Sequence, residues 1–174
     1  LDRITEYNSA DLTVHVEAGV TLGRLQQELE AKNQMLPLDP WNGPEATIGG
    51  IAATNAQGPF RAVGSIRDWI IGMRVVHADG RASKTGGRVV KNVTGYDLAK
   101  LYTGSLGSLG VIESAWLRLR PRPAGTRWLA LPERAADDAL ARGTAAARLV
   151  SVRACALLSA AGAPLRGVVE LAGA

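Results

Sequence analysis

The chain has 174 residues, 47% of them hydrophobic, which is enough for one good core or two small ones and excludes a disordered protein. Its formal net charge of +4 comes from Lys and Arg residues that are spread out and mixed with acids, which argues against nucleic-acid binding. Its apolar run at residues 69–76 is broken by Gly72 and Arg74 and is far shorter than the roughly 20 residues of a spanning helix, so we expect a soluble globular protein.

The cysteine and histidine content also limits the possible functions. Cys155 is the single cysteine and cannot form an internal disulfide, which fits a reducing, cytoplasmic setting. Two histidines and one distant cysteine give no spacing suited to zinc or an iron–sulfur cluster, so no metal site is expected. We see no export leader, and we interpret both ends of the chain as interrupted.

The first third of the chain predicts a strand, a helix, a loop and a second helix. Apolar and polar residues alternate over residues 12–17, which is typical of a strand with one buried face. Thr21 caps an amphipathic helix that ends near Asn33, and prolines make residues 35–41 an extended loop. Thr47 caps a helix over residues 48–56, although two glycines in its first turn cost roughly 1 kcal/mol each relative to alanine.

The middle of the chain predicts a hairpin between two glycine-bearing loops. A loop over residues 58–67 precedes a strand over residues 69–77, and the turn at Asp79 and Gly80 leads into a second, short strand. Residues 96–102 predict a brief helix with Leu98 and Leu101 inward. A loop over residues 104–110 and a strand over residues 111–119 follow, and prolines close the segment.

The composition changes after residue 132, where alanine becomes abundant. We expect a helix over residues 133–150 and weaker strands at residues 154–158 and 168–171. Prolines and a glycine punctuate residues 122–126 and place a domain boundary there, between a domain over residues 1–123 and another over residues 124–174.

The helix start at Thr47 is the most informative segment for function. A helix N-terminus offers unpaired amide donors, and Gly49 and Gly50 would let a pyrophosphate approach the backbone. The alternative is that Gly49, Gly50, Ala52 and Ala53 only permit tight helix–strand packing. Both interpretations stay open on this segment alone.

Two further small-residue loops, residues 58–68 and 104–110, have a similar character. Three such loops beside predicted strands would converge on one anionic ligand through their amides. A phosphate loop ending in lysine and a G-x-G-x-x-G fingerprint are both absent, which argues against P-loop and Rossmann sites.

Five co-linear motifs between residues 12 and 123 carry a family resemblance. They are Pro37-x-Asp39-Pro40, Thr47-Ile48-Gly49-Gly50, Gly64-Ser65-Ile66-Arg67-Asp68, Val90-Lys91-Asn92-Val93-Thr94-Gly95-Tyr96-Asp97-Leu98 and Gly104-Ser105-x-Gly107-x-Leu109-Gly110-Val111-Ile112. In this order they resemble the vanillyl-alcohol-oxidase family, whose FAD-binding domain is called PCMH-type. Within that family they are most similar to the FAD-binding subunit of glycolate oxidases.

The resemblance implies an α+β fold, with a mixed sheet flanked by helices and the start of a C-terminal cap domain. It also implies noncovalent FAD, held by Pro40, Thr47, Ile48, Gly49, Gly50, Ala53, Thr54, Gly58, Gly64, Ser65, Arg67, Asp68, Gly107, Gly110, Val111 and Ile112. An N-terminal subdomain with another phosphate loop is largely missing. We therefore expect FAD binding weaker than in an intact subunit, and weaker than micromolar.

Several other side chains are open to more than one interpretation. Arg67 and Lys91, which lie in the motifs, are expected to neutralise phosphate charge, whereas Arg61 is equally well explained as a solvated charge. Tyr96 either stacks near the cofactor or anchors its helix. His15 and His77 lie on predicted strands, away from where relatives attach flavin covalently, and are interpreted as ordinary residues.

The resemblance implies oxidation of a 2-hydroxy acid such as glycolate, or electron relay for a sister subunit. Catalytic residues are not identifiable. The implied partners are a second flavoprotein subunit and an iron–sulfur subunit, in a cytoplasmic complex at the inner face of the membrane. Alternatives are a D-lactate dehydrogenase-like FAD-linked oxidase and a non-catalytic assembly or electron-relay subunit.

Overall fold

The computed structural model of the chain describes residues 1–88, 97–130, 136–146, 148–149, 152–158 and 166–173. The chain divides into two compact units, of which one comprises Leu1–Gly58 and Gly64–Arg122 and the other Pro59–Val63 and Pro123–Ala174. The sequence division at residue 123 placed Pro59–Val63 in the first domain. This segment groups with the second unit because its 3-10 helix η2 (Pro59–Ala62) contacts strand β9 (Val152–Leu158). The assignment of the second unit to a cap domain stays a prediction.

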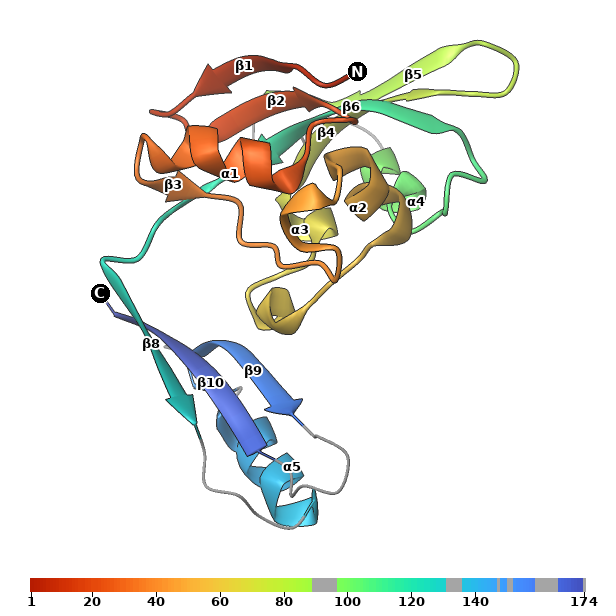
Figure 1. Ribbon diagram of the computed structural model, residues 1–174. Helices are drawn as coiled ribbons and strands as arrows, with labels where there is room; N and C mark the ends of the chain where they lie inside the picture. The colour runs from red at the N-terminus through yellow and green to blue at the C-terminus, as the bar shows by residue number, and fades with distance from the viewer. Residues whose placement is uncertain (89–96, 131–135, 147, 150–151, 159–165, 174) are drawn as a thin grey trace. The chain divides into compact units, whose positions relative to one another are not determined.

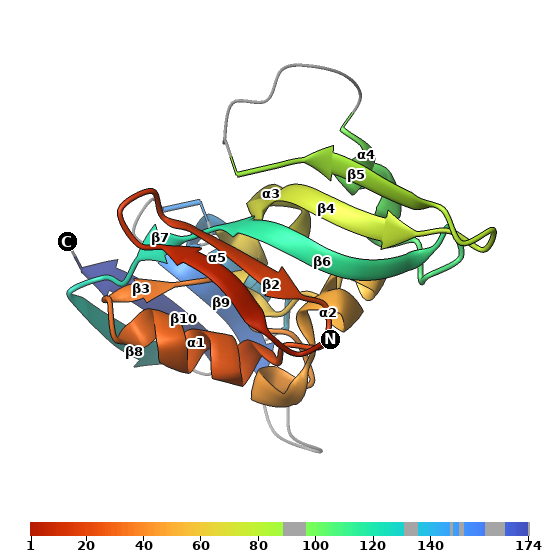
Figure 2. The same ribbon diagram turned by 90° about the horizontal axis from the view of Figure 1, so that it is seen from above.

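A five-stranded sheet in the order β1-β2-β6-β4-β5 forms the centre of the first unit (Figures 1 and 2). Its strands are β1 (Ile4–Asn8), β2 (Thr13–Glu17), β4 (Ile70–Val76), β5 (Ala82–Gly86) and β6 (Val111–Arg118). The α+β class is confirmed. The pairings described in this sheet are all antiparallel, so the expected mixed sheet is wrong here. Short turns join β1 to β2 and β4 to β5, whereas parallel neighbours need a long crossover.

Four helices lie on one side of this sheet (Figure 1). They are α1 (Leu22–Glu30), α2 (Ile48–Thr54), α3 (Ile66–Trp69) and α4 (Leu98–Tyr102). Val14 and Val16 on β2 pair with Leu117 and Ala115 on β6, and all four side chains are at most 2% exposed. Because side chains alternate along a strand, the residues between them point to the other face.

The predicted caps of α1 and α2 are confirmed. The Thr21 hydroxyl accepts a hydrogen bond from the Arg24 amide at 3.3 Å, and Thr47 accepts one from the Gly50 amide at 3.1 Å. The apolar stripe of α1 is buried as its spacing predicted: Leu22, Leu25 and Leu29. After α1 the chain forms the short strand β3 (Gln34–Met35), which pairs with β7 (Arg120–Pro121), and then continues without regular structure as the prolines predicted.

Several predicted boundaries and orientations were wrong. Helix α2 ends at Thr54, two residues early, because Asn55 adopts a left-handed conformation with φ 51°. Trp69 closes α3 and does not begin the following strand. On α4, Leu98 and Leu101 are 37% and 56% exposed, and the buried pair is Ala99 and Tyr102. The sequence did not predict β1, whose side chains are partly or fully exposed and carry little periodic signal.

The second unit is a three-stranded antiparallel sheet, β8-β10-β9, with one helix against it. Its remaining elements are β8 (Gly125–Ala130), α5 (Ala136–Ala146) and β10 (Arg166–Gly173). The helix and the two weaker strands were predicted, but β8 was not, because its residues are all exposed. The Arg153 guanidinium lies 4.8 Å from the centroid of the Phe60 ring, which attaches η2 to β9. The Cys155 thiol is partly buried and donates to the Gly143 carbonyl at 3.5 Å.

Candidate functional site

The N-terminus of α2 does not present free amides to a ligand. The Ile48 amide donates to the Val20 carbonyl at 2.9 Å, and the Gly49 amide donates to the Ala18 carbonyl at 2.7 Å. The next amide, of Gly50, is taken by the Thr47 cap. The expectation of unpaired donors at this helix start is therefore wrong, because the loop after β2 supplies their acceptors.

Close packing explains the first glycine of α2. A Cβ atom on Gly49 would lie 2.6 Å from the Ala18 Cβ and 3.0 Å from the Ala18 carbonyl oxygen. Gly50 is exposed, and a Cβ there would approach only the Thr47 hydroxyl, at 3.0 Å. Of the two interpretations of this segment, the structure favours tight helix–strand packing for Gly49.

The C-terminal end of α2 is where the loop over residues 104–110 docks. The Gly104 amide donates to the Ala52 carbonyl at 2.9 Å, and the Leu106 amide donates to the Ala53 carbonyl at 2.8 Å. Asn55 follows in its left-handed conformation, with a buried Oδ1 that has no hydrogen-bond partner among the described residues. Sequence reasoning did not single out Asn55, although asparagine after a helix is a known left-handed cap.

The loop over residues 104–110 has an unusual backbone and an open side. Positive φ angles occur at Gly104 (81°), Leu106 (54°), Gly107 (77°) and Gly110 (151°). A Cβ on Gly107 would meet no atom within 4 Å, so space is open next to this backbone. Leu106 is 76% exposed and Val111, at the start of β6, is 67% exposed. An open glycine beside exposed apolar side chains suits a flat, largely apolar ring.

The segment from Gly64 to Trp69 forms a compact turn and helix next to α2. The Asp68 carboxylate accepts the Ser65 amide at 2.8 Å and the Ser65 hydroxyl at 3.0 Å, so it orients the loop as predicted. Arg67 is exposed, with no carboxylate partner in the described part of the chain. Its guanidinium is therefore available to an anion.

The Pro37–Pro40 motif and Gly58 are in direct contact. A Cβ on Gly58 would lie 2.0 Å from the Asp39 carbonyl oxygen, so only glycine fits there. Pro40, which follows Asp39 in the sequence, is buried. The contact fixes the path of the chain that leaves α2.

Four of the five motifs thus gather around α2 in the first unit. Three contain or contact the helix directly, and one contacts the chain that leaves it, at Gly58. Most of the remaining motif, with Lys91 and Tyr96, lies outside the described residues, and Arg61 lies in the second unit. Gly49 lies in the first turn of α2, whereas the Gly107 loop bonds to the carbonyls of Ala52 and Ala53 nearer the other end of the helix. The Gly49 amide already donates to Ala18, so it is not a free donor for a diphosphate, and the convergence of the loops on one anion stays a prediction.

These residues fit one part of FAD better than another. The open loop around Gly107, with Leu106 and Val111 exposed, suits the flavin ring, and the free charge of Arg67 suits a phosphate. The start of α2 offers a phosphate no donor in its first turn. A cofactor bound here would contact the loop over residues 104–110 and the C-terminal end of α2 and would not contact the first turn of the helix.

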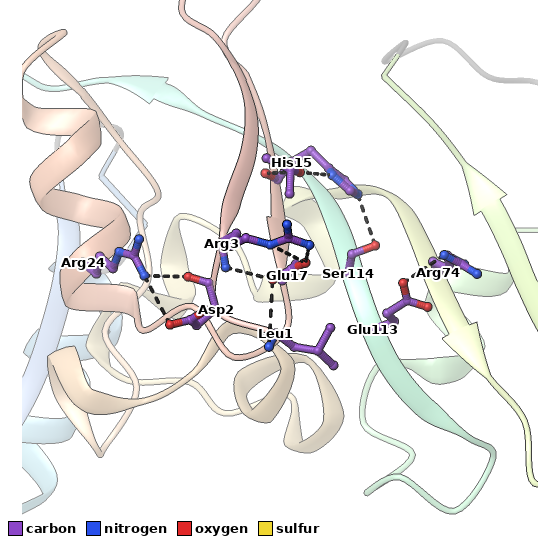
Figure 3. Close-up of polar contacts among 10 residues, drawn as sticks. Leu1, Asp2, Arg3, His15, Glu17, Arg24, Arg74, Glu113 and Ser114 are labelled. Carbon is purple, nitrogen blue, oxygen red and sulfur yellow. Dashed lines mark hydrogen bonds and ion pairs between the residues drawn. The ribbon is translucent and has the colours of Figure 1, made fainter.

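The opposite face of the sheet contains a polar groove that the sequence did not indicate (Figure 3). Its volume is about 500 Å³, and its lining includes His15, Glu17, Glu113, Ser114 and Trp116. Figure 3 shows its ion pairs, in which Arg3 binds Glu17 at 2.6 Å and Arg74 binds Glu113 at 2.9 Å. These charges satisfy one another.

Both ring nitrogens of His15 have hydrogen-bond partners in this network. The Thr5 hydroxyl lies 2.5 Å from Nδ1 and 3.2 Å from the His15 carbonyl oxygen. The Ser114 hydroxyl lies 3.1 Å from Nε2. Burial lowers the pKa of His15, whereas Arg3 lowers the pKa of Glu17 to about 2 by hydrogen bonding to its carboxylate. The interpretation of His15 as an ordinary residue stays a prediction, and its ring is engaged within the protein.

The described residues contain neither a cluster of metal-ligating side chains nor a membrane-spanning helix. No group of three or more acidic, cysteine or histidine side chains is placed to hold a metal ion. None of the described helices combines the length and the apolar content required to cross a membrane.

The fold and the loops around α2 define a PCMH-type FAD-binding domain, and comparison with known proteins agrees. The family model described as "FAD binding domain" matches residues 1–86, which contain strands β1, β2, β4 and β5 of the sheet and helices α1 to α3. The chain belongs to this family of FAD-binding domains.

Two curated relatives and one solved structure are particularly similar. Glycolate oxidase subunit GlcE of Escherichia coli K12 is 40% identical over 122 residues, which is 69% of this chain and 35% of that protein. The mitochondrial D-lactate dehydrogenase [cytochrome] of Arabidopsis thaliana is 40% identical over 124 residues, or 71% of this chain and 22% of that protein. The chain therefore spans about a third or less of these relatives. The solved structure is an alkyldihydroxyacetonephosphate synthase, which aligns with 99% of this chain over 37% of its own length, with a TM-score of 0.79. At 18% sequence identity this similarity shows the fold alone.

Proposed function

We propose that the protein containing this chain oxidises a 2-hydroxy acid with noncovalently bound FAD, and that glycolate is its substrate. The observation that carries the proposal is the 40% identity to a glycolate oxidase subunit over 122 residues, which is 69% of the chain. When bound, FAD supplies the group that accepts a hydride equivalent from the substrate.

The residues of the chain would position the cofactor. The backbone at Gly107 and the exposed side chain of Val111 would lie against the flavin ring, and Arg67 would face a phosphate. Asp68 would keep that loop in shape through its bonds to Ser65. The other predicted cofactor-binding residues remain part of the proposal, with the first turn of α2 contributing shape and packing.

Noncovalent binding is supported by the surroundings of the two histidines. His15 uses both ring nitrogens in the groove network, on the sheet face opposite Val14 and Val16. The ring nitrogens of His77 also have protein partners, Leu109 and Ser83. A histidine that linked flavin would need one ring nitrogen for that bond.

The proposal extends to a complex. Because the similar E. coli protein is one subunit of an oxidase, we propose partners of the same kind, a second flavoprotein subunit and an iron–sulfur subunit, in the cytoplasm at the inner membrane face. The second candidate substrate is D-lactate, which the equally high identity to a D-lactate dehydrogenase favours.

The test uses the full-length natural protein. After purification, an absorption band near 450 nm, which belongs to oxidised flavin itself, is expected, and acid precipitation should release the yellow colour into the supernatant. Anaerobic addition of glycolate or D-lactate should then bleach the band, and the substrate that bleaches it faster is the physiological class. A colourless protein that FAD does not reconstitute contradicts the proposal, and a flavoprotein that neither acid bleaches indicates a non-catalytic subunit.

A further inference from the structure

His77 lies at the junction of the β4–β5 hairpin and the loop over residues 104–110. It follows β4 directly, and its amide donates to the Arg81 carbonyl at 2.8 Å, which closes the hairpin. Its ring Nδ1 lies 3.2 Å from the Leu109 carbonyl oxygen. Because a carbonyl only accepts, this bond places the proton of the neutral ring on Nδ1.

The other ring nitrogen of His77 is anchored to the hairpin and to α4. With the proton on Nδ1, Nε2 accepts from the Ser83 hydroxyl at 2.7 Å. The Tyr102 hydroxyl lies 3.4 Å from the same nitrogen, and the two rings are 5.9 Å apart between centroids. Tyr102 is 6% exposed, so this contact belongs to a packed region. The imidazole is therefore fixed through Nε2, and its Nδ1 donates to the Leu109 carbonyl.

Gly110, the residue after Leu109, packs closely against the end of β4. Gly110 has φ 151°, and a Cβ there would lie 2.7 Å from Val75 Cγ1 and 2.8 Å from the Val76 carbonyl oxygen. At its other end the loop is bonded to the carbonyls of Ala52 and Ala53 on α2. The loop is thus attached at both ends, while Gly107 between them faces open space.

We propose that His77 is a positioning residue for the flavin loop: its Nδ1–H bond to Leu109 sets the backbone that presents Gly107 and Val111 to FAD. This inference rests on the proposed flavin function of the loop. It assigns a role to a residue that sequence reasoning set aside, and the role needs no contact between His77 and the cofactor.

A matched pair of substitutions separates this role from simple packing. Asparagine places an amide N–H near the position of Nδ1, so His77→Asn keeps a donor for Leu109. Glutamine reaches the position of Nε2, so His77→Gln keeps a partner for Ser83 and loses the bond to the loop. Ser83→Ala is the control, because it removes the hydroxyl on the Nε2 side and leaves the loop bond in place.

Two measurements on the full-length protein decide the matter. FAD dissociation constants are expected to rise about tenfold in His77→Gln, the effect of one lost hydrogen bond, and to stay within about threefold of the unmodified value in His77→Asn and Ser83→Ala. Hydrogen exchange of the amides at residues 107–111, measured without FAD, should accelerate in His77→Gln only.

The outcomes of these measurements are distinguishable. If the unmodified protein binds no FAD, the proposed function fails, but the exchange rates still test whether the His77–Leu109 bond fixes the loop. Equal FAD affinity and equal exchange in the two His77 variants would overturn the inference, as would a larger effect of His77→Asn than of His77→Gln. If Ser83→Ala matches His77→Gln in both measurements, packing of the hairpin is the cause and the inference is also wrong.

Discussion

The start of α2 and the loop over residues 104–110 are both rich in glycine, but their glycines serve different purposes. At Gly49 the missing side chain lets the helix touch Ala18, and the neighbouring amides bond to protein carbonyls. At Gly107 the missing side chain permits a φ of 77°, and the space that a side chain would occupy is open. Glycine in a motif therefore marks either close packing or exposed backbone, and the two can be separated by experiment.

The largest effect is expected from Gly49→Ala. Its new methyl group would overlap Ala18, and such overpacking costs about 1–3 kcal/mol, more than the roughly 1 kcal/mol that alanine gains in a helix. Urea unfolding of the 174-residue chain should show this loss of stability. Gly50→Ala, one residue on and exposed, is the control and should cost little or be stabilising. Equal stability of the two variants would contradict the packing role of Gly49.

The next effect, on cofactor binding, is expected from Gly107→Ala. A left-handed alanine is strained by about 1 kcal/mol, and its methyl group would occupy the open space proposed for the flavin ring. Fluorescence titration of the full-length protein should show FAD binding weakened about tenfold or more.

Gly80→Ala is a matched control for that experiment. Gly80 has φ 81° and no neighbour within 4 Å of a new Cβ, but it lies in the β4–β5 turn. The two variants should lose similar stability, and only the Gly107 variant should lose affinity. If both bind FAD equally well, Gly107 does not face the cofactor.

A smaller effect is expected from removing the cap of α2. Thr47→Ala leaves the Gly50 amide without its acceptor and should lower the unfolding free energy by about 1 kcal/mol, which thermal unfolding would detect. Thr47→Ser keeps the hydroxyl and should be close to the unmodified chain. Because the cap bonds to the helix itself, FAD affinity should change less than in Gly107→Ala.

The smallest effect is a pH dependence at the end of β2, next to Ala18. Arg3 lowers the pKa of Glu17 from 4.5 to about 2, so the folded chain favours the carboxylate. The resulting stabilisation is present above pH 4.5 and is lost as the pH falls toward about 2. Comparison of the chain with Glu17→Gln by urea unfolding should show a stability difference at about pH 6 that fades over this window. A difference that grows on acidification would reverse the assigned sign.

Local patterns in the sequence predicted most of the first unit. The leucine spacing of α1, the threonine caps of α1 and α2, the turn at Gly80 and the alternation of β2 all act over a few residues. Elements with exposed side chains, such as β1 and β8, were missed because no face of them is marked by burial. The inward face of α4 was assigned by hydrophobicity, whereas Tyr102 is buried instead because its ring packs beside His77.

The family, the α+β class and the motifs that surround α2 were determined by the sequence alone, since they depend on residue types in a fixed order. Which amides are free, which glycines are packed and where His77 bonds were decided only by the tertiary structure. The reason is that each of these depends on an acceptor or a surface brought from far along the chain, as Ala18 is brought to Gly49 and Leu109 to His77.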